Sequence, residues 1–89
     1  MIEREVTVMN RAGLHTRPAS MIVRTASKFE ADFFIQKDSY EINGKSIIGV
    51  MTLAAEQGAS LILVFEGEDE DEAAAAMIDL FQEGFGEVK

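Results

Sequence analysis

The sequence of 89 residues contains no cysteine, no tryptophan, one proline and one histidine. Without cysteine, the chain can form no disulfide, no thiolate nucleophile and no cysteine-ligated zinc site. A single histidine also excludes a metal site built from several imidazoles, so we expect no metal. A chain this short leaves no interior space for a large buried cofactor, so we expect none. Because a secreted domain of this size usually needs disulfides, we expect a cytoplasmic protein.

Basic residues are scarce as well. The chain has 8 Lys and Arg against 16 Asp and Glu, which gives a net charge of −8. A nucleic-acid binder needs a cationic face to displace the counterions of the phosphate backbone, so this class is disfavoured. No apolar run approaches the ~20 residues that a membrane span requires, and the first residues lack the pattern of a signal peptide. We therefore expect no insertion into a membrane.

Hydrophobic residues nevertheless make up 47% of the chain, which is enough for one compact core. At this length we expect a single domain over residues 1–89, without linkers or repeats.

The apolar pattern predicts four strands. Ile2, Val6 and Val8 alternate with polar residues, which is typical of a half-buried strand. Apolar or alternating segments predict further strands at Phe33–Lys37, Tyr40–Ile42 and Leu61–Phe65, with a tight turn at Asp38-Ser39 and a central position for the last strand.

Three helices complete the pattern. The first begins around Thr16 to Pro18, where Thr can cap and proline is tolerated in the first turn. The second is capped by Ser46 and ends at Gln57-Gly58, and the third runs from Glu70 to Gly84. The order β-α-β-β-α-β-α predicts an α+β open-faced sandwich, a four-stranded and mostly antiparallel sheet with helices on one face.

The single histidine stands in an unusual context. His15 immediately precedes a helix start, where free backbone N–H groups and the helix dipole attract anions. Arg17 adds a guanidinium group suited to phosphate oxygens, and Gly13 allows a tight loop. These residues predict a nucleophilic imidazole beside a cradle for a phosphoryl group. A solvated loop that only caps the helix explains them equally well on physical grounds alone.

Other apparent motifs fail on spacing or context. The segment Gly44-Lys45-Ser46 ends like a phosphate-binding P-loop, but position 39 holds serine instead of glycine. The acidic run Glu66–Glu72 lacks the spacing of a calcium-binding loop. We expect it to form a solvated turn that places acids at the start of the last helix, away from His15.

Ser46 is better suited to a switch than to catalysis. As an N-cap it contributes about 1 kcal/mol, and a phosphate there would add negative charge beside Ile47, Ile48 and Met51. If these three form a docking face, modification would weaken some partners and recruit others. We also expect at least one of the three to lie in the core.

Two segments carry a family resemblance. Asn10–Ala19, which reads NRAGLHTRPA, resembles the active-site signature of the HPr family, the histidine-containing phosphocarrier proteins of the phosphoenolpyruvate-dependent sugar phosphotransferase system. Asn43–Met51, which reads NGKSIIGVM, resembles the regulatory serine segment of the same family. The similarity covers essentially the whole chain, because length, element order and both motif positions agree.

The resemblance implies a role for each of these residues. His15 would accept a phosphoryl group on Nδ1 from phosphorylated enzyme I and pass it to sugar-specific IIA domains, while Arg17 would neutralise its charge. Ser46 would be the target of an ATP-dependent HPr kinase/phosphorylase where the organism has one, with effects on transfer and on a transcriptional regulator. The residues that match partner-docking positions are Thr16, Ser20, Arg24, Ile47, Ile48 and Met51.

Two residues depart from the family pattern. Thr16 stands where the family usually has alanine, and Ala54 stands where many relatives carry glycine. Both bear on transfer rates and partner preference and leave the reacting groups in place.

Arg11, Arg17 and Arg24 are expected to gather near His15 and to make the local potential positive.

The leading hypothesis is a monomeric phosphocarrier that turns over no substrate alone. One alternative is a regulatory binding protein of the same fold that acts through Ser46-dependent docking. Another is a carrier in a nitrogen-related phosphorelay.

Overall fold

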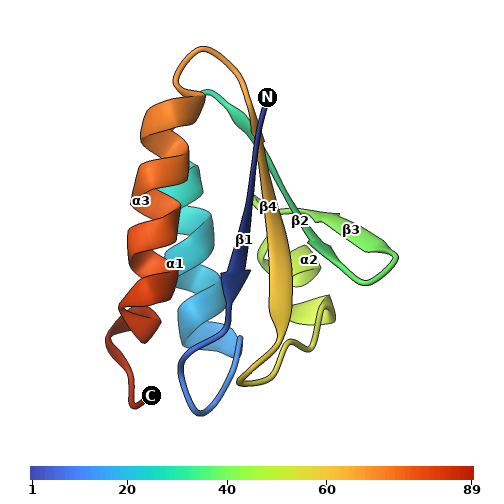
Figure 1. The fold of residues 1–89 in the computed structure, drawn as a ribbon, viewed down its shortest axis with the longest axis vertical. Coiled ribbons are helices and arrows are strands. Elements are labelled where there is room, and N and C mark those ends of the chain that lie inside the picture. Colours follow the sequence, from blue (N-terminus) through green and yellow to red (C-terminus); the bar gives the residue numbers. More distant parts are fainter.

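The computed structural model describes all 89 residues. The elements follow in the predicted order, and no helix has the length and apolar character needed to span a membrane. They are β1 (Ile2–Thr7), α1 (Thr16–Ala26), β2 (Asp32–Lys37), β3 (Tyr40–Asn43), α2 (Ile47–Thr52), β4 (Ser60–Glu66) and α3 (Glu70–Gln82), followed by a short 3₁₀ turn at Gly84–Gly86 (Figure 1).

The strands form one sheet in the order β1-β4-β2-β3, and every neighbouring pair is antiparallel. The helices pack on one face of this sheet, with α1 and α3 side by side in Figure 1. The predicted open-faced sandwich is therefore confirmed. β4 is a central strand, as its apolar run predicted, and Asp38-Ser39 joins β2 to β3 in a two-residue turn.

Aromatic pairs organise the core between the sheet and the helices. Phe33 and Phe65 are paired across β2 and β4, and their rings stack at 4.8 Å between centroids. Phe81 and Phe85 meet edge to face at 5.0 Å at the end of α3. Ile22 of α1 is fully buried against this core.

The N-cap of helix α1 lies one residue earlier than expected. His15 is its N-cap and Thr16 its first helical residue, so the predicted cap by Thr16 is wrong. The helix ends at Ala26, and Phe29 lies half-buried in the loop that follows.

Helix α2 is shorter than predicted. It ends at Thr52 instead of Gln57-Gly58, because the following carbonyls have partners outside the helix. The Leu53 carbonyl accepts from Lys37 Nζ at 3.0 Å, and the Ala55 carbonyl accepts from the Leu14 N–H at 2.9 Å. Ala54, between them, adopts a φ of 49°.

The acidic run begins α3, as predicted, but two of its carboxylates do more than face solvent. Asp69 accepts hydrogen bonds from the backbone N–H groups of Glu30 at 2.9 Å and Ala31 at 2.8 Å. Glu70 accepts from the Gly67 N–H at 3.0 Å and pairs with the N-terminal amine at 3.1 Å. These contacts join α3 to the α1–β2 loop and to β1.

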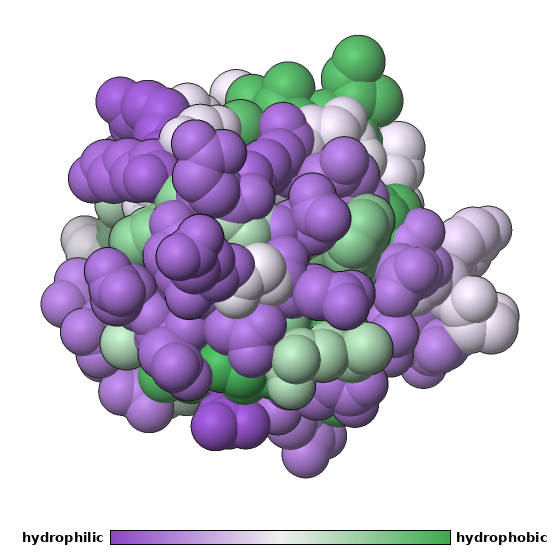
Figure 2. All heavy atoms as spheres, turned by 90° about the horizontal axis from the view of Figure 1, so that it is seen from above, coloured by the Kyte–Doolittle hydropathy of each residue, from purple (hydrophilic) through white to green (hydrophobic).

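The acidic run and the start of α1 lie at opposite ends of the molecule (Figure 1). Seen from the end that carries the acidic run, the surface is mainly hydrophilic (Figure 2). The expectation that these acids lie away from His15 is confirmed.

Candidate functional site

A tight loop positions His15 at the start of α1. Gly13 has a φ of 75°, and a Cβ at this position would lie 2.5 Å from the Ala55 carbonyl oxygen, so only glycine fits without a shift. The His15 N–H donates to the Gly13 carbonyl at 3.0 Å, and the His15 carbonyl accepts from the Ala19 N–H at 3.0 Å. The loop thus places the imidazole at the N-terminal end of α1.

The first turn of α1 offers free donors beside the imidazole. The backbone N–H groups of Thr16 and Arg17 have no acceptor in the structure, and Pro18 has no N–H. Together with the helix dipole they form an anion-attracting end, as the sequence predicted.

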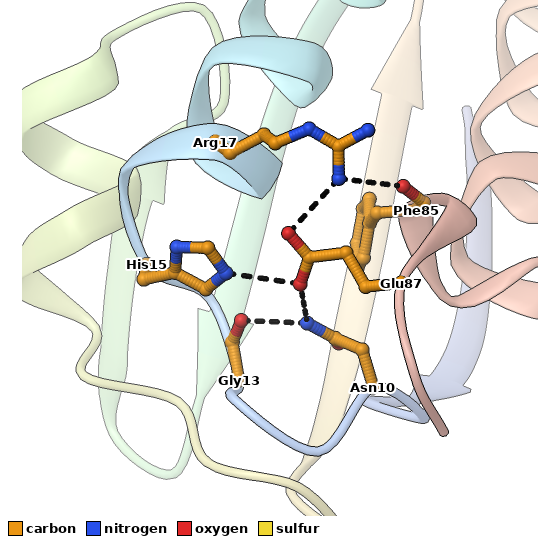
Figure 3. A network of polar contacts seen from close by, with 6 residues as sticks. All are labelled: Asn10, Gly13, His15, Arg17, Phe85 and Glu87. Carbon is orange, nitrogen blue, oxygen red and sulfur yellow. Dashed lines mark hydrogen bonds and ion pairs between the residues drawn. The ribbon is translucent and has the colours of Figure 1, made fainter.

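The side-chain carboxylate of Glu87, in the segment after α3, lies beside His15 and Arg17 (Figure 3). Glu87 Oε1 lies 2.9 Å from His15 Nε2 and 3.0 Å from Asn10 Nδ2, while Glu87 Oε2 accepts from an Arg17 Nη atom at 3.0 Å. Sequence reasoning missed Glu87, because no local pattern relates it to a residue 72 positions earlier in the chain.

Asn10 holds the Glu87 carboxylate by a hydrogen bond. Its side chain is fully buried, and Nδ2 donates to the Gly13 carbonyl at 2.8 Å as well as to Glu87. Its Oδ1 has no partner. Asn10 thereby ties the loop that carries His15 to the C-terminal segment that carries Glu87.

These contacts fix the charge of the carboxylate. The hydrogen bond from His15 is the largest of several effects that hold the pKa of Glu87 below its ordinary value, and the bonds from Asn10 and Arg17 act in the same direction. Partial burial opposes them and does not prevail. Glu87 is therefore ionised at neutral pH and can only accept hydrogen bonds.

The imidazole itself is open to solvent. The His15 side chain is 43% exposed, and its Nδ1 has no hydrogen-bond partner. A hollow of about 400 Å³ lies beside it, lined by Arg11, Ala12, His15, Glu87 and Val88.

The three arginines expected near His15 do not all gather there. Arg11 lines the hollow and Arg17 contacts Glu87, but Arg24 lines a separate hollow with Met21, Thr25 and Lys28. The negative charge of Glu87 also partly offsets the two arginines that are present.

The remaining sequence-predicted residues occupy the neighbouring helices α1 and α2, which pack against each other. Thr16 and Arg24 are exposed on α1, and Ser20 is half-buried there. Ser46 is the N-cap of α2, as predicted, and its Oγ accepts from the Gly49 N–H at 3.1 Å.

Three apolar residues of α2 lie on the surface. Ile47, Ile48 and Met51 are 38%, 74% and 42% exposed, so the expectation that one of them lies in the core is wrong. Val50 and Leu53 supply the buried side instead. No group of three or more His, Cys, Asp or Glu side chains is placed to hold a metal ion.

Comparison with known proteins gives concordant matches. The family model described as the PTS HPr component phosphorylation site matches residues 2–83. The phosphocarrier protein HPr of Treponema pallidum is 47% identical over 87 residues, which cover 98% of this chain and 99% of the relative.

Solved structures extend these matches to the fold. A crystal structure of HPr from Thermoanaerobacter tengcongensis superposes with a TM-score of 0.95 at 44% identity and covers 100% of both chains. The structure of Bacillus subtilis Crh, described as a catabolite repression protein and an intertwined, domain-swapped dimer, has a TM-score of 0.72 at 37% identity and covers 100% of this chain and 99% of its own.

Proposed function

The chain belongs to the HPr family of phosphocarrier proteins of the phosphotransferase system, and from this premise we propose that His15 is its phosphoryl carrier. The donor would be phosphorylated enzyme I, and the acceptors would be the IIA domains of sugar permeases, with the exchange taking place in the cytoplasm. The observation that carries the proposal is the exposed Nδ1 of His15 without a partner, beside the two unpaired N–H groups of Thr16 and Arg17.

The geometry supports a direct transfer. The lone pair on Nδ1 forms the bond to phosphorus while the bond between phosphorus and the donor breaks and its electron pair leaves with the donor. The free N–H groups at the start of α1 stabilise the equatorial oxygens. Arg17 uses one Nη atom for Glu87 and the Phe85 carbonyl, while its other Nη atom and its Nε have no partner and are available to the phosphoryl oxygens. The IIA domain receives the group by the same step in reverse.

Intact mass after incubation with phosphoenolpyruvate and enzyme I tests this proposal. We expect the wild-type chain to gain one phosphate that is lost in acid, as a phosphate on nitrogen is. His15→Ala is expected to gain none while keeping its fold, because the side chain is exposed and is not part of the hydrophobic core.

Ser46→Ala is the matched control, since it removes the other candidate phosphate acceptor and leaves His15 untouched. It should accept phosphate at the wild-type level. Acceptance by a folded His15→Ala chain, or an acid-stable phosphate on the wild type, would overturn the assignment to His15.

Regulation at Ser46 is the second part of the proposal. Phosphorylation by an ATP-dependent HPr kinase/phosphorylase would replace the cap bond to Gly49 and place negative charge beside Ile47, Ile48 and Met51. With Thr16, Ser20 and Arg24 of the adjacent helix, these apolar side chains form the docking surface that we propose for enzyme I and the IIA domains.

A regulatory binding role is the alternative. The fold similarity to Crh and the exposed apolar side of α2 favour it, because both allow output through docking alone. It predicts that a transcriptional regulator binds the Ser46-phosphorylated chain whether or not His15 can be phosphorylated.

We propose a monomer as the carrier form, and sedimentation equilibrium would test it against a dimer like that described for Crh.

A further inference from the structure

The C-terminal segment holds Glu87 in place from both sides. Gly84, Phe85 and Gly86 have φ values of 62°, 59° and 72°, which reverse the chain after α3. Phe85 is fully buried against Phe81, and the Val88 carbonyl accepts from the Arg11 N–H at 2.7 Å. A non-glycine residue such as Phe85 keeps a left-handed backbone only where the surrounding structure supports it, so packing and hydrogen bonds hold this turn in one conformation.

The partners of Glu87 dictate where the imidazole keeps its proton. The side chain is 16% exposed, and every polar group that contacts it is a donor or can become one: Asn10 Nδ2, Arg17 Nη and His15 Nε2. An ionised carboxylate only accepts, so the 2.9 Å contact requires a hydrogen on Nε2. In the neutral ring Nδ1 then has the free lone pair, and Figure 3 shows this nitrogen on the side of the ring away from Glu87.

We propose that Glu87 is a positioning residue for phosphoryl transfer at His15: its carboxylate holds the proton on Nε2 and orients Nδ1 as the nucleophile. The inference rests on the proposed function. When Nδ1 forms the bond to phosphorus and the donor's bond breaks, the proton stays on Nε2 and the ring gains positive charge. The carboxylate at 2.9 Å stabilises that charge. In the return step the ring leaves as neutral imidazole, and no proton has to move.

Arg17 makes this arrangement compatible with an incoming anion. A lone carboxylate near Nδ1 would repel the phosphoryl oxygens, but Glu87 is paired with the Arg17 guanidinium at 3.0 Å. The unpaired N–H groups of Thr16 and Arg17 add positive potential at the start of α1.

Glu87→Gln tests the proposal with little change in shape, because the amide keeps the size of the side chain and removes the charge. A glutamine can satisfy His15 and Asn10 only by turning its own NH₂ toward Arg17, where two donors oppose each other. Glu83→Gln is the matched control: it makes the same charge change four positions earlier, at an exposed residue whose side chain makes no hydrogen bond or ion pair in the structure.

Two readouts are needed. The ¹⁵N chemical shifts of the His15 ring report the tautomer, and rapid-quench transfer from phosphorylated enzyme I reports the rate. In the wild type and Glu83→Gln we expect the Nε2–H tautomer alone. In Glu87→Gln we expect both tautomers and transfer slower by about tenfold, the lower end of the loss known for removing the hydrogen-bond partner of a metal-binding histidine.

An unchanged transfer rate in Glu87→Gln would overturn the proposal, and so would a slower rate with an unchanged tautomer, which would indicate a merely structural effect. A wild-type chain that accepts no phosphoryl group would overturn the proposed function, and the inference with it. A wild type that accepts normally while Glu87→Gln is equally fast would overturn the inference alone.

Discussion

At the scale of single residues, His15 has two nitrogens in different surroundings. Nε2 is bound to a carboxylate that is brought from the other end of the chain, and Nδ1 is free beside a helix end. Thr16, the departure from the family pattern next to His15, is exposed, and its hydroxyl makes no hydrogen bond. Because that hydroxyl is free to meet a phosphoryl oxygen, we expect Thr16 to affect the lifetime of a phosphate on His15; the N-cap of α1 is His15 and not Thr16.

Ser46→Asp is expected to slow phosphoryl acceptance from enzyme I by about tenfold. The new carboxylate lies at the edge of the apolar surface of α2, and its desolvation on contact with enzyme I weakens docking. Acceptance kinetics at varied enzyme I concentration measure it, with the effect expected in KM. Ser39→Asp adds the same charge in the exposed β2–β3 turn and serves as the control. Equal kinetics for the two variants would remove Ser46 as a switch.

At the scale of elements, α2 differs most from the expectation. The apolar pattern after Ser46 continues past Thr52 and predicts a longer helix, while the structure ends it after six residues. The reason is tertiary: the carbonyls of Leu53 and Ala55 bond to Lys37 and to the loop before His15. The end of α2 therefore supports the loop that carries His15, and Ala54 takes a φ of 49° to allow it.

Ala54→Gly is expected to stabilise the protein by roughly 0.5–1 kcal/mol. A left-handed backbone costs an alanine about 1–2 kcal/mol, and the larger entropy of glycine in the unfolded chain returns only part of that. Urea unfolding measures the change.

The control for Ala54→Gly is Ala75→Gly at an exposed position inside α3, where glycine should destabilise by about 1 kcal/mol. If both glycine substitutions destabilise to the same extent, the backbone of Ala54 is not strained.

At the scale of the whole molecule, the charges are divided between two ends. The acidic run lies at the end opposite the start of α1, so a protein with a net charge of −8 still presents arginines and free N–H groups around its histidine. Asp69 and Glu70 are also structural, because they join α3 to the α1–β2 loop and to the chain start.

Stability is expected to fall in acid. Hydrogen bonds from Glu30 and Gly67, respectively, are the main causes that lower the pKa values of Asp69 and Glu70, and the bond from His15 does the same for Glu87. A carboxyl whose pKa is lower in the folded state stabilises the protein above its unfolded pKa and loses that contribution as the pH falls through the folded value. The urea midpoint should therefore change little from pH 7 to about 5 and drop below about pH 4.5.

The loss in acid should be shallower in Asp69→Asn, which has one such group fewer. A urea midpoint that stays constant or rises between pH 4.5 and 3 would contradict the linkage, because relief of the general negative charge would then outweigh the three carboxylates.

The sequence by itself determined the order of elements, the alternation of the first strand, the β2–β3 turn, the Ser46 cap and the position of His15 before a helix. These features depend on periodicity and capping, which act between residues a few positions apart. Only the tertiary structure decided that Ile47, Ile48 and Met51 are all exposed, that α2 stops at Thr52, and that Glu87 contacts His15. Those outcomes depend on hydrogen bonds and packing between segments distant in the chain, which no local pattern encodes.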